Sequence, residues 1–426
     1  MEPGATHPAA RPAAPLDSDA MAPRDEPGGG VGTAELQALR DNVSPALSRF
    51  LADLETLVNI DCGSYTKAGV DRVGRWTGAV LEELGAAVEY RPDPAGRLGD
   101  TVVATFAGAA GGPRVLLIGH LDTVFDEGTA AARPFEITDG IARGPGVTDM
   151  KSGLLAGLYA IRALRDTLGE LPFERLVYVA NPDEEIGSPV STPHIRELAS
   201  GIDACFVLEC ARANGDIVSA RKGTVDLQIV VHGVAAHAGV EPEKGRSAIL
   251  EAARLTRDLH ALNGQFPGVT VNVGVIAGGT RPNVVAERCV LGVDVRATSA
   301  ADQDRAEGTI RELAARAEVP GTRIEVNWQI GHRPMEKLER STRLVDHAVA
   351  LAGRLGFELS DTATGGASDA NTTSGLGVPT LDGLGPIGGL DHSPREYLEV
   401  ASIVPRTTLL AALLLAVARD PKPTAG

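Results

Sequence analysis

The stretch at residues 115–125 reads VLLIGHLDTVF and indicates the fold class most clearly. Its first four residues form an apolar run that predicts a strand, and two polar residues, His120 and Asp122, follow directly. Further strands are expected at 87–90, 101–106, 176–180 and 205–208. The near-continuous apolar character of most of these runs is typical of a sheet that is covered on both faces.

Helices are expected between and around these strands, because apolar residues recur there at helical spacing. The first covers residues 36–57, where Pro45 can kink or break it. Others are expected at 73–85, 152–167, 342–355 and 404–417. Alternating strands and helices indicate an α/β layer with a mostly parallel sheet.

The middle of the chain follows a different order. Strands are expected at 224–231, 269–276, 288–295 and 323–329, and helices at 246–262 and 300–317. This order, β-α-β-β-α-β, is that of a ferredoxin-like domain, which forms a self-contained unit. We therefore expect an α/β domain at 35–221 and 332–420, with a ferredoxin-like domain inserted at 222–331. Residues 1–34 and 421–426 are expected to be tails, the first disordered because it is rich in Ala, Pro, Gly and charge.

The size and charge of the chain exclude several classes of protein. A chain of 426 residues is longer than one hydrophobic core usually accommodates, so two domains are expected. The formal charge of −16 argues against nucleic acid and anionic membrane surfaces as partners. No apolar run approaches the ~20 residues that span a bilayer. The start of the chain lacks the apolar core of a secretory signal.

The four cysteines show no metal-binding spacing, so we interpret them as structural residues: Cys62, Cys205, Cys210 and Cys289. Free thiols fit a reducing compartment, and a cytoplasmic location is expected.

His120 and Asp122 stand two residues apart in an extended segment, so their side chains project from the same face. A carboxylate in that position can orient an imidazole, as the outer partners of metal-bound histidines do. The alternative is a histidine at a strand end, with an aspartate that starts a turn.

Three further carboxylates follow Gly-rich or strand-end sequence. Asp149 lies in GPGVTDMKSG, where glycines permit close backbone approach, although aspartate is also favoured at helix starts. Glu184 and Glu185 follow a predicted strand and repel each other unless a cation or proton compensates. As neighbours in an extended segment they would face opposite ways; a solvated acidic loop is the alternative.

Glu209 and His392 complete the set. Glu209 ends the apolar run ACFVLE, where a charge needs a partner, and His392 lies in the loop GGLDHSP, where a surface histidine is the alternative. The residues of this set are imidazoles and carboxylates, and most stand where a predicted strand ends. Ligands of open α/β sheets bind beyond the carboxyl ends of strands. Together these residues would form a nitrogen and oxygen site suited to zinc or a similar divalent ion.

At these residues the chain resembles the M20 family of metallopeptidases, and within it the glutamate carboxypeptidase-like branch. The motifs that carry the resemblance occur in the family's order over about residues 38–418: GHLDTV, GPGVTDMKSG, NPDEEIGS, LEC, AAHAG and GGLDHS. The resemblance implies two zinc ions, with cobalt or manganese as other possible metals, and a cis peptide bond after Asp149.

The resemblance also assigns roles to the cluster. Asp149 would bridge the ions; His120 and Glu209 would complete the ligands of one, and Glu185 and His392 those of the other. Glu184 would be the general base, and Asp122 would orient His120.

Four residues outside the cluster match substrate-binding positions of the family. His237 and Asn283 match positions that act from the partner subunit, which implies a homodimer; a loop residue and a turn cap are the alternatives. Arg333 matches an arginine that binds the free α-carboxylate of the substrate, with a surface ion pair as the alternative. Gly366, in the stretch TGGASD with Gly365 and Ser368, would bring backbone close to the substrate.

The expected activity is cleavage of the amide between an acyl or peptidyl group and an amino acid with a free α-carboxylate. Glutamate release stays open, because Cys210 replaces a proline of relatives and the surroundings of Lys222 do not reproduce a glutamate pocket. An aminoacylase or biosynthetic deprotecting hydrolase is the alternative within the family. A catalytically silent protein that binds a small acidic ligand and a purely structural metal site are the alternatives of other classes.

Overall fold

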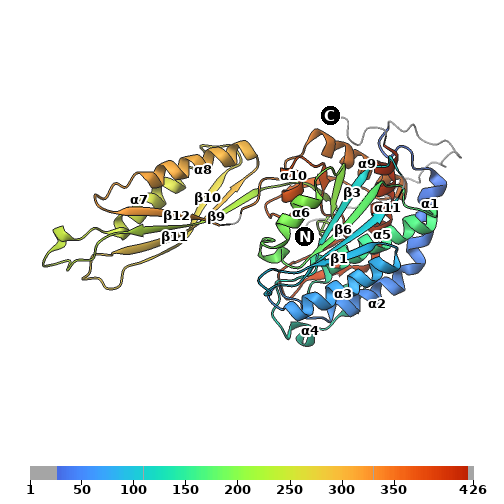
Figure 1. The fold of residues 1–426 in the computed structure, drawn as a ribbon, viewed down its shortest axis with the longest axis horizontal. Helices are drawn as coiled ribbons and strands as arrows, with labels where there is room; N and C mark the ends of the chain where they lie inside the picture. The colour runs from blue at the N-terminus through green and yellow to red at the C-terminus, as the bar shows by residue number, and fades with distance from the viewer. Residues whose placement is uncertain (1–25, 109, 330, 421–426) are drawn as a thin grey trace, which may run out of the picture.

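The computed structural model describes residues 26–108, 110–329 and 331–420, which form a body, with helices on both faces of a sheet, and an elongated unit projecting from it (Figure 1). The body is built on a six-stranded sheet in the order β1-β2-β6-β3-β7-β14. The three pairs between β6 and β14 are parallel, and β1 and β2 add two antiparallel pairs at one edge. The strands are β1 (Ala87–Arg91), β2 (Thr101–Ala107), β3 (Arg114–His120), β6 (Arg175–Asn181), β7 (Ala204–Val207) and β14 (Thr380–Leu381).

The apolar strands of this sheet are covered on both faces, as their composition predicts. In β3, Leu117 belongs to the large core with the long helices, whereas Leu116 and Ile118 belong to a second core on the opposite face. The helices of the large core are α1 (Thr33–Val43), α2 (Leu47–Val58), α3 (Lys67–Glu83), α5 (Ser152–Leu168), α9 (Glu339–Leu355) and α11 (Ile403–Arg419). The second core packs against α6 (Ser191–Leu198) and α10 (Asp369–Gly375).

The predicted break at Pro45 is confirmed, because a 3-10 turn at Ser44–Ala46 separates α1 from α2. The helix expected at 73–85 begins earlier, at Lys67. Several short strands were not expected: β4 (Glu136–Thr138), β5 (Ile141–Arg143), β8 (Ile217–Arg221), β13 (Asp361–Thr364), β15 (Gly388–Gly389) and β16 (Tyr397–Glu399).

The projecting unit has the expected β-α-β-β-α-β order, with its strands antiparallel in the order β10-β11-β9-β12. Its elements are β9 (Gly223–His232), α7 (Ala248–His260), β10 (Thr270–Gly278), β11 (Arg288–Ala297), α8 (Ala300–Ala315) and β12 (Arg323–Trp328). Its two helices and one face of its sheet enclose a separate core. The segments that connect it to the body pair with each other at Arg221–Met335 and Thr224–His332.

One expectation about the chain ends needs correction. Disorder was expected through residue 34, but residues 26–34 pack against the body: the Gly28 N–H donates to His347 Nδ1 at 2.8 Å, and Val31 is buried. Arg354 Nη2 also donates to the Val31 carbonyl at 2.8 Å. The expected tail at 1–25 and the expected tail at 421–426 lie outside the described residues.

The expectation that no apolar run could span a bilayer is also wrong when only the length and composition of the helices are considered. Within the described residues, the 20-residue segment Val400–Arg419 is long and apolar enough, but 78% of its most apolar window is buried inside the protein. Apolar side chains on all sides of α11 meet α1, α5 and α9, so α11 is a core helix of the body.

Candidate metal centre

The predicted site residues gather where the parallel strands end. His120 is the last residue of β3, Glu184 and Glu185 follow β6, and Glu209 lies two residues beyond β7. Because β3 is parallel to both β6 and β7, their carboxyl ends meet at one edge of the sheet. Glu184 and Glu185 begin a 3-10 turn, Glu184–Ile186, and not the extended segment that was expected.

Asp149 enters the cluster from the turn Val147–Lys151, which precedes α5. The peptide bond between Asp149 and Met150 is cis, as the resemblance implied. The buried Glu396 carboxylate holds this turn by accepting the backbone N–H groups of Gly146 at 2.9 Å, Thr148 at 2.9 Å and Asp149 at 3.1 Å. Glu396 lies four residues after His392, so one loop carries both an imidazole of the cluster and the anchor for Asp149.

Asp149 stands at the centre, with one imidazole at each oxygen. Its Oδ1 lies 3.1 Å from His120 Nε2, and its Oδ2 lies 3.2 Å from His392 Nε2. Beyond these contacts, His120 Nε2 lies 3.5 Å from Glu209 Oε1, and His392 Nε2 lies 3.0 Å from Glu185 Oε2. The side chains thus form two groups, which share the Asp149 carboxylate.

Asp122 contacts the His120 ring on the side that faces away from Asp149, and it also contacts the turn of Glu184 and Glu185. Its Oδ1 lies 3.3 Å from His120 Nδ1, so Nε2 of the ring faces the cluster. The same carboxylate accepts the backbone N–H groups of Glu184 and Glu185, each at 3.2 Å, and the Ser64 hydroxyl at 2.6 Å. Asp122 therefore fixes both the imidazole and the turn that carries the two glutamates.

The cluster carries more negative charge than its own imidazoles balance. Burial raises the pKa of the Glu184 and Glu209 carboxyls well above their ordinary value, and nearby carboxylates raise it further. Hydrogen bonds to Asp149 and Glu185 raise the pKa of His392 to about 11. Burial thus combines with the crowding of acidic groups around two imidazoles, a situation that a bound cation relieves.

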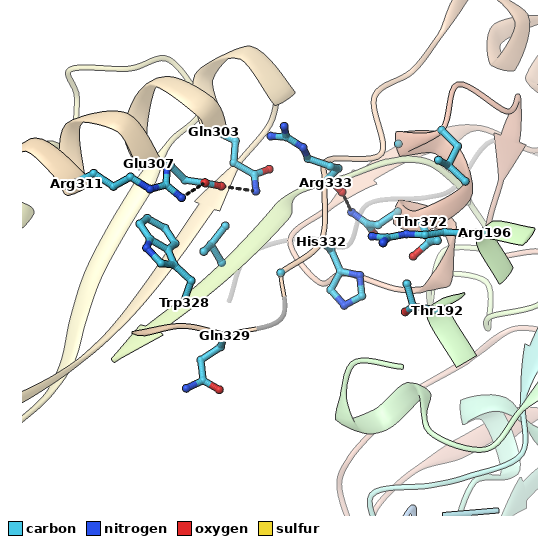
Figure 2. A pocket seen from close by; sticks show the side chains of 15 residues that line it. Thr192, Arg196, Gln303, Glu307, Arg311, Trp328, Gln329, His332, Arg333 and Thr372 are labelled. Atoms are coloured by element: carbon cyan, nitrogen blue, oxygen red, sulfur yellow. Dashed lines mark hydrogen bonds and ion pairs between the residues drawn. The ribbon is translucent and has the colours of Figure 1, made fainter. Parts of the chain in front are cut away.

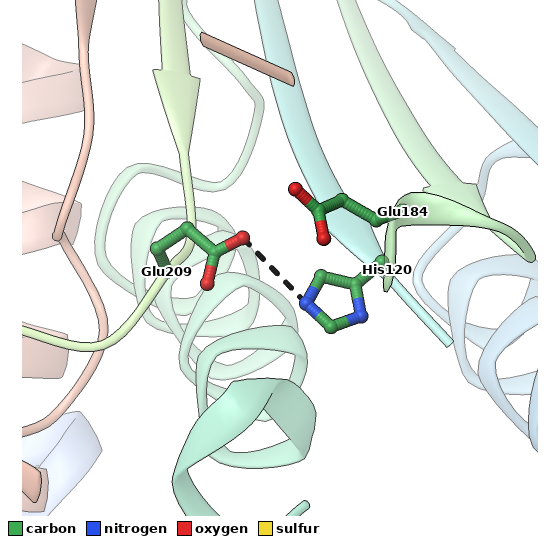
Figure 3. Close-up of side chains that lie close together, drawn as sticks. All are labelled: His120, Glu184 and Glu209. Carbon is green, nitrogen blue, oxygen red and sulfur yellow. Dashed lines mark ion pairs between the residues drawn. The ribbon is translucent and has the colours of Figure 1, made fainter. Parts of the chain in front are cut away.

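The donor atoms fit a divalent metal. Ligand atoms of His120, Glu184 and Glu209 lie within 4.8 Å of one another, and so do those of His120, Asp149 and Glu185. Figure 3 shows the Glu184 and Glu209 carboxylates beside the His120 ring. Nitrogen and oxygen donors without a thiolate suit zinc and similar ions in catalytic sites, whereas structural zinc sites are usually rich in cysteine. The four cysteines are free and buried, and none belongs to either group.

The remaining predicted residues lie outside the cluster. His237 and Asn283 are neighbours, since the Ala238 N–H donates to the Asn283 carbonyl at 3.0 Å. Both lie at the end of the projecting unit away from the body, because the ten residues of β9 separate the junction from the loop of His237. A strand of that length spans about 30 Å, so neither side chain reaches the cluster of its own chain.

Arg333 forms the surface ion pair that was its alternative: its Nη1 lies 2.6 Å from Asp304 Oδ1, and both side chains are about half exposed. The Gly366 carbonyl accepts a hydrogen bond from Arg221 Nη1 at 3.1 Å. Ser368 caps α10 and donates to Asp382 Oδ2 at 2.6 Å. This part of the TGGASD stretch is therefore engaged within the protein.

Sequence reasoning missed Ser64, Glu396 and Arg221. The buried Arg221 guanidinium binds Asp382 at 2.7 Å, and although burial opposes its charge, Asp382 and Glu209 raise its pKa. Arg221 is the last residue of the short strand β8, and a charge at the end of that mostly buried strand was the available sequence signal. Ser64 had no such signal, because its partner lies 58 residues away.

Comparison with known proteins agrees with this geometry. Residues 116–416 match the model of peptidase family M20/M25/M40. The chain belongs to the M20 family. It is 31% identical over 396 residues to carboxypeptidase G2 of Pseudomonas sp. (strain RS-16), covering 90% of this chain and 94% of that protein. It is also 31% identical over 353 residues to acetylornithine deacetylase of Proteus mirabilis (strain HI4320), covering 78% and 87%.

The fold is that of solved M20 structures. Aminopeptidase PepT from Bacillus cereus aligns with a TM-score of 0.72 at 23% identity, covering 87% of this chain and 99% of that one. The chain is therefore a hydrolytic enzyme of the M20 metallopeptidase and amidohydrolase class. Its relatives include both a carboxypeptidase and a deacetylase, so family membership alone does not define its substrate.

Proposed function

We propose that this M20 enzyme is a di-zinc hydrolase that cleaves the amide between an acyl or peptidyl group and an amino acid with a free α-carboxylate. The observation that carries the proposal is the placement of Asp149, whose two oxygens face His120 and His392. A carboxylate placed between two such groups suits a pair of cations that share it as a bridge.

In this proposal Asp149 would be the ligand that the two ions share. His120 and Glu209 would complete the protein ligands of one ion, and Glu185 and His392 those of the other; cobalt or manganese would suit the same donors. Zinc supplies Lewis acidity in such a site, which makes water more acidic and polarises a carbonyl. Asp122 keeps His120 Nε2 directed at the metal by holding the opposite side of the ring.

Glu184 is the proposed general base. Among the residues that the structure describes, Glu185 pairs with His392 and Glu209 with His120, whereas the Glu184 side chain has no hydrogen-bond or ion-pair partner. Its backbone is nevertheless fixed by Asp122. A carboxylate that is positioned but unpaired can accept a proton from water and return it to the leaving amine. A catalytically silent binding protein would have no use for such a group.

The substrate class is tested by incubating the zinc-loaded enzyme with a panel of N-acyl amino acids and dipeptides and measuring the amino acids released. We expect turnover only where the leaving amino acid has a free α-carboxylate, and amidated analogues should be inert. If glutamate is the only amino acid released, the result supports a glutamate-releasing carboxypeptidase. If only substrates with other leaving amino acids turn over, the result supports an aminoacylase or deprotecting hydrolase. Equal turnover of amidated substrates contradicts the proposed recognition of the carboxylate.

We also propose that the enzyme is a homodimer, joined through the projecting unit. Strand β10 lies at the edge of its sheet, and Val275 and Ile276 on it are 58% and 53% exposed. Leu250, on the adjacent helix α7, is 61% exposed. An apolar edge strand of this kind is prone to pair with another chain. A partner would cover it and could bring His237 and Asn283 to the cluster of the opposite subunit.

Subunit complementation tests this arrangement. His237→Ala and Glu184→Gln dimers should each be nearly inactive, but a refolded equal mixture should recover about a quarter of wild-type activity. Half of the dimers are then mixed, and one of their two sites is intact. The matched control mixes His237→Ala with Asn283→Ala, where every site lacks one group, and should recover nothing. Mixed dimers without recovery, or a monomer in sedimentation analysis, would contradict the proposal.

The proposal also includes the boundaries of the domains and the cellular compartment of the enzyme. We propose a dimerisation domain at 222–331 between catalytic residues 35–221 and 332–420, and the pairing of the two connecting segments supports a junction there. A cytoplasmic location is supported by the four buried cysteines, which are all free.

A further inference from the structure

A cavity of about 500 Å³ lies in the crease between the body and the projecting unit (Figure 2). Helices α6 and α10 line it from the body, and α8 with the end of β12 lines it from the projecting unit. None of the metal-cluster residues lines it. Val225 and Trp328, which line it, belong to or pack against the core of the projecting unit. We therefore distinguish this cavity from the metal centre and refer to it as the crease pocket.

The crease pocket is rich in arginine. Arg311 stacks on Trp328, 4.0 Å from the ring centroid, and lies 3.3 Å from Glu307, while Arg333 pairs with Asp304. Arg196, on α6, has no hydrogen-bond or ion-pair partner among the described residues. Three guanidinium groups thus line the pocket, and two of them are paired with a carboxylate, in a chain whose net charge is −16.

Neutral polar groups in the same walls are also unsatisfied. Gln303 is 3% exposed, and its side-chain carbonyl is buried without a hydrogen-bond partner. The Thr192 hydroxyl, on the opposite wall, is likewise buried and unpartnered. Burial and the charges of Arg196 and Arg296 lower the pKa of His332, which keeps this imidazole neutral at pH 7 and able to donate one hydrogen bond. Unpaired buried polar groups are uncommon in folded proteins, and these two atoms lie beneath the surface of the pocket walls.

We propose that the crease pocket binds a small organic polyanion that carries carboxylate or phosphate groups. Guanidinium groups recognise both chemistries through paired N–H···O bonds. Arg196 comes from the body and Arg311 from the projecting unit, so an anion held by both ties the two parts of the molecule together. A volume of about 500 Å³ is within the range of small-molecule sites.

The test titrates tricarballylate, a tricarboxylate, and inorganic phosphate separately into the full-length zinc-loaded enzyme by calorimetry, with ionic strength held constant by chloride. We expect one site for each chain, at which Arg196→Gln and Arg311→Gln each weaken binding at least about tenfold. Preference for tricarballylate identifies a carboxylate ligand, and preference for phosphate identifies a phosphorylated one. Hydrolysis by Arg196→Gln without added anion should stay within about twofold of wild type, since this residue lies outside the metal cluster.

Arg257→Gln is the matched control, because Arg257 is an exposed arginine of α7 and does not line the crease pocket. This variant should bind like wild type, and thermal unfolding should show that all three variants fold. A second readout is hydrogen exchange at β12 and His332, which should slow when the anion binds. The proposal is overturned if neither anion binds, if binding survives both pocket substitutions, or if substrate competes for the anion.

Discussion

Glu184→Gln should lower kcat by about three orders of magnitude, the usual contribution of a general base, while the enzyme keeps its metal. The side chain is unpaired in the cluster, and its amide replacement has nearly the same shape but cannot accept a proton. Glu184→Ala should have the same effect on turnover. The measurement combines steady-state kinetics with metal analysis of the same protein sample.

The matched control for this prediction is Glu127→Gln, which alters an exposed glutamate outside the cluster and should leave kcat unchanged. If Glu184→Gln retains wild-type kcat, Glu184 has no role in proton transfer. If it loses metal together with activity, Glu184 is a ligand and another group must be the base.

Asp149→Asn should remove both metal and activity. The substitution keeps the size of the side chain but removes the charge that faces His120 on one side and His392 on the other. Loss of an outer partner of a metal ligand weakens metal affinity by about 10–100-fold, so loss of the shared ligand should exceed that range. Competition with a chromophoric chelator measures the affinity, and elemental analysis measures the bound metal.

Asp126→Asn, at an exposed aspartate outside the cluster, controls for a general loss of negative charge and should bind metal like wild type. Thermal unfolding of metal-free wild type and Asp149→Asn should be similar, because the carboxylate is surrounded by ligands and not by apolar core. An Asp149→Asn enzyme that retains its metal would contradict the bridging role.

The main elements of both parts of the fold could be predicted because their side-chain patterns are strong. Strand β3 is apolar on both faces, and the structure buries Leu116 and Leu117 in different cores. In the projecting unit, β11 alternates buried and partly exposed residues along its length, which sequence periodicity detects directly. In long regular elements the pattern of apolar and polar residues follows which side chains are buried. These predictions were therefore confirmed.

Short elements and chain ends could not be predicted in this way. Strands such as β15, with two glycines, are stabilised by pairing with remote segments and have no pattern of their own. Residues 26–34 are polar and Gly-rich, yet they are held by His347 and Arg354, which lie more than 300 positions away. Helix α11 satisfies the composition of a membrane span because it is buried on nearly all sides.

The cluster itself was accessible from sequence, because parallel strands bring their carboxyl ends together and each strand end carried an imidazole or carboxylate. The groups that support the cluster were not accessible. The Glu396 carboxylate accepts hydrogen bonds from backbone N–H groups about 250 positions away. Such contacts require no particular residue type nearby in the sequence, so no local pattern predicts them. The resemblance to relatives supplied the remaining residues: the roles of His237 and Asn283 stay predictions that depend on an assembly, and Arg333 forms a surface ion pair with Asp304.

Anomalous X-ray diffraction from crystals of the zinc-loaded enzyme, recorded on both sides of the zinc edge, tests the central claim most directly. We predict two zinc peaks for each chain, one on either side of the Asp149 carboxylate, with His120 and Glu209 at one and Glu185 and His392 at the other. A single peak, or two peaks that do not share Asp149, would contradict the account.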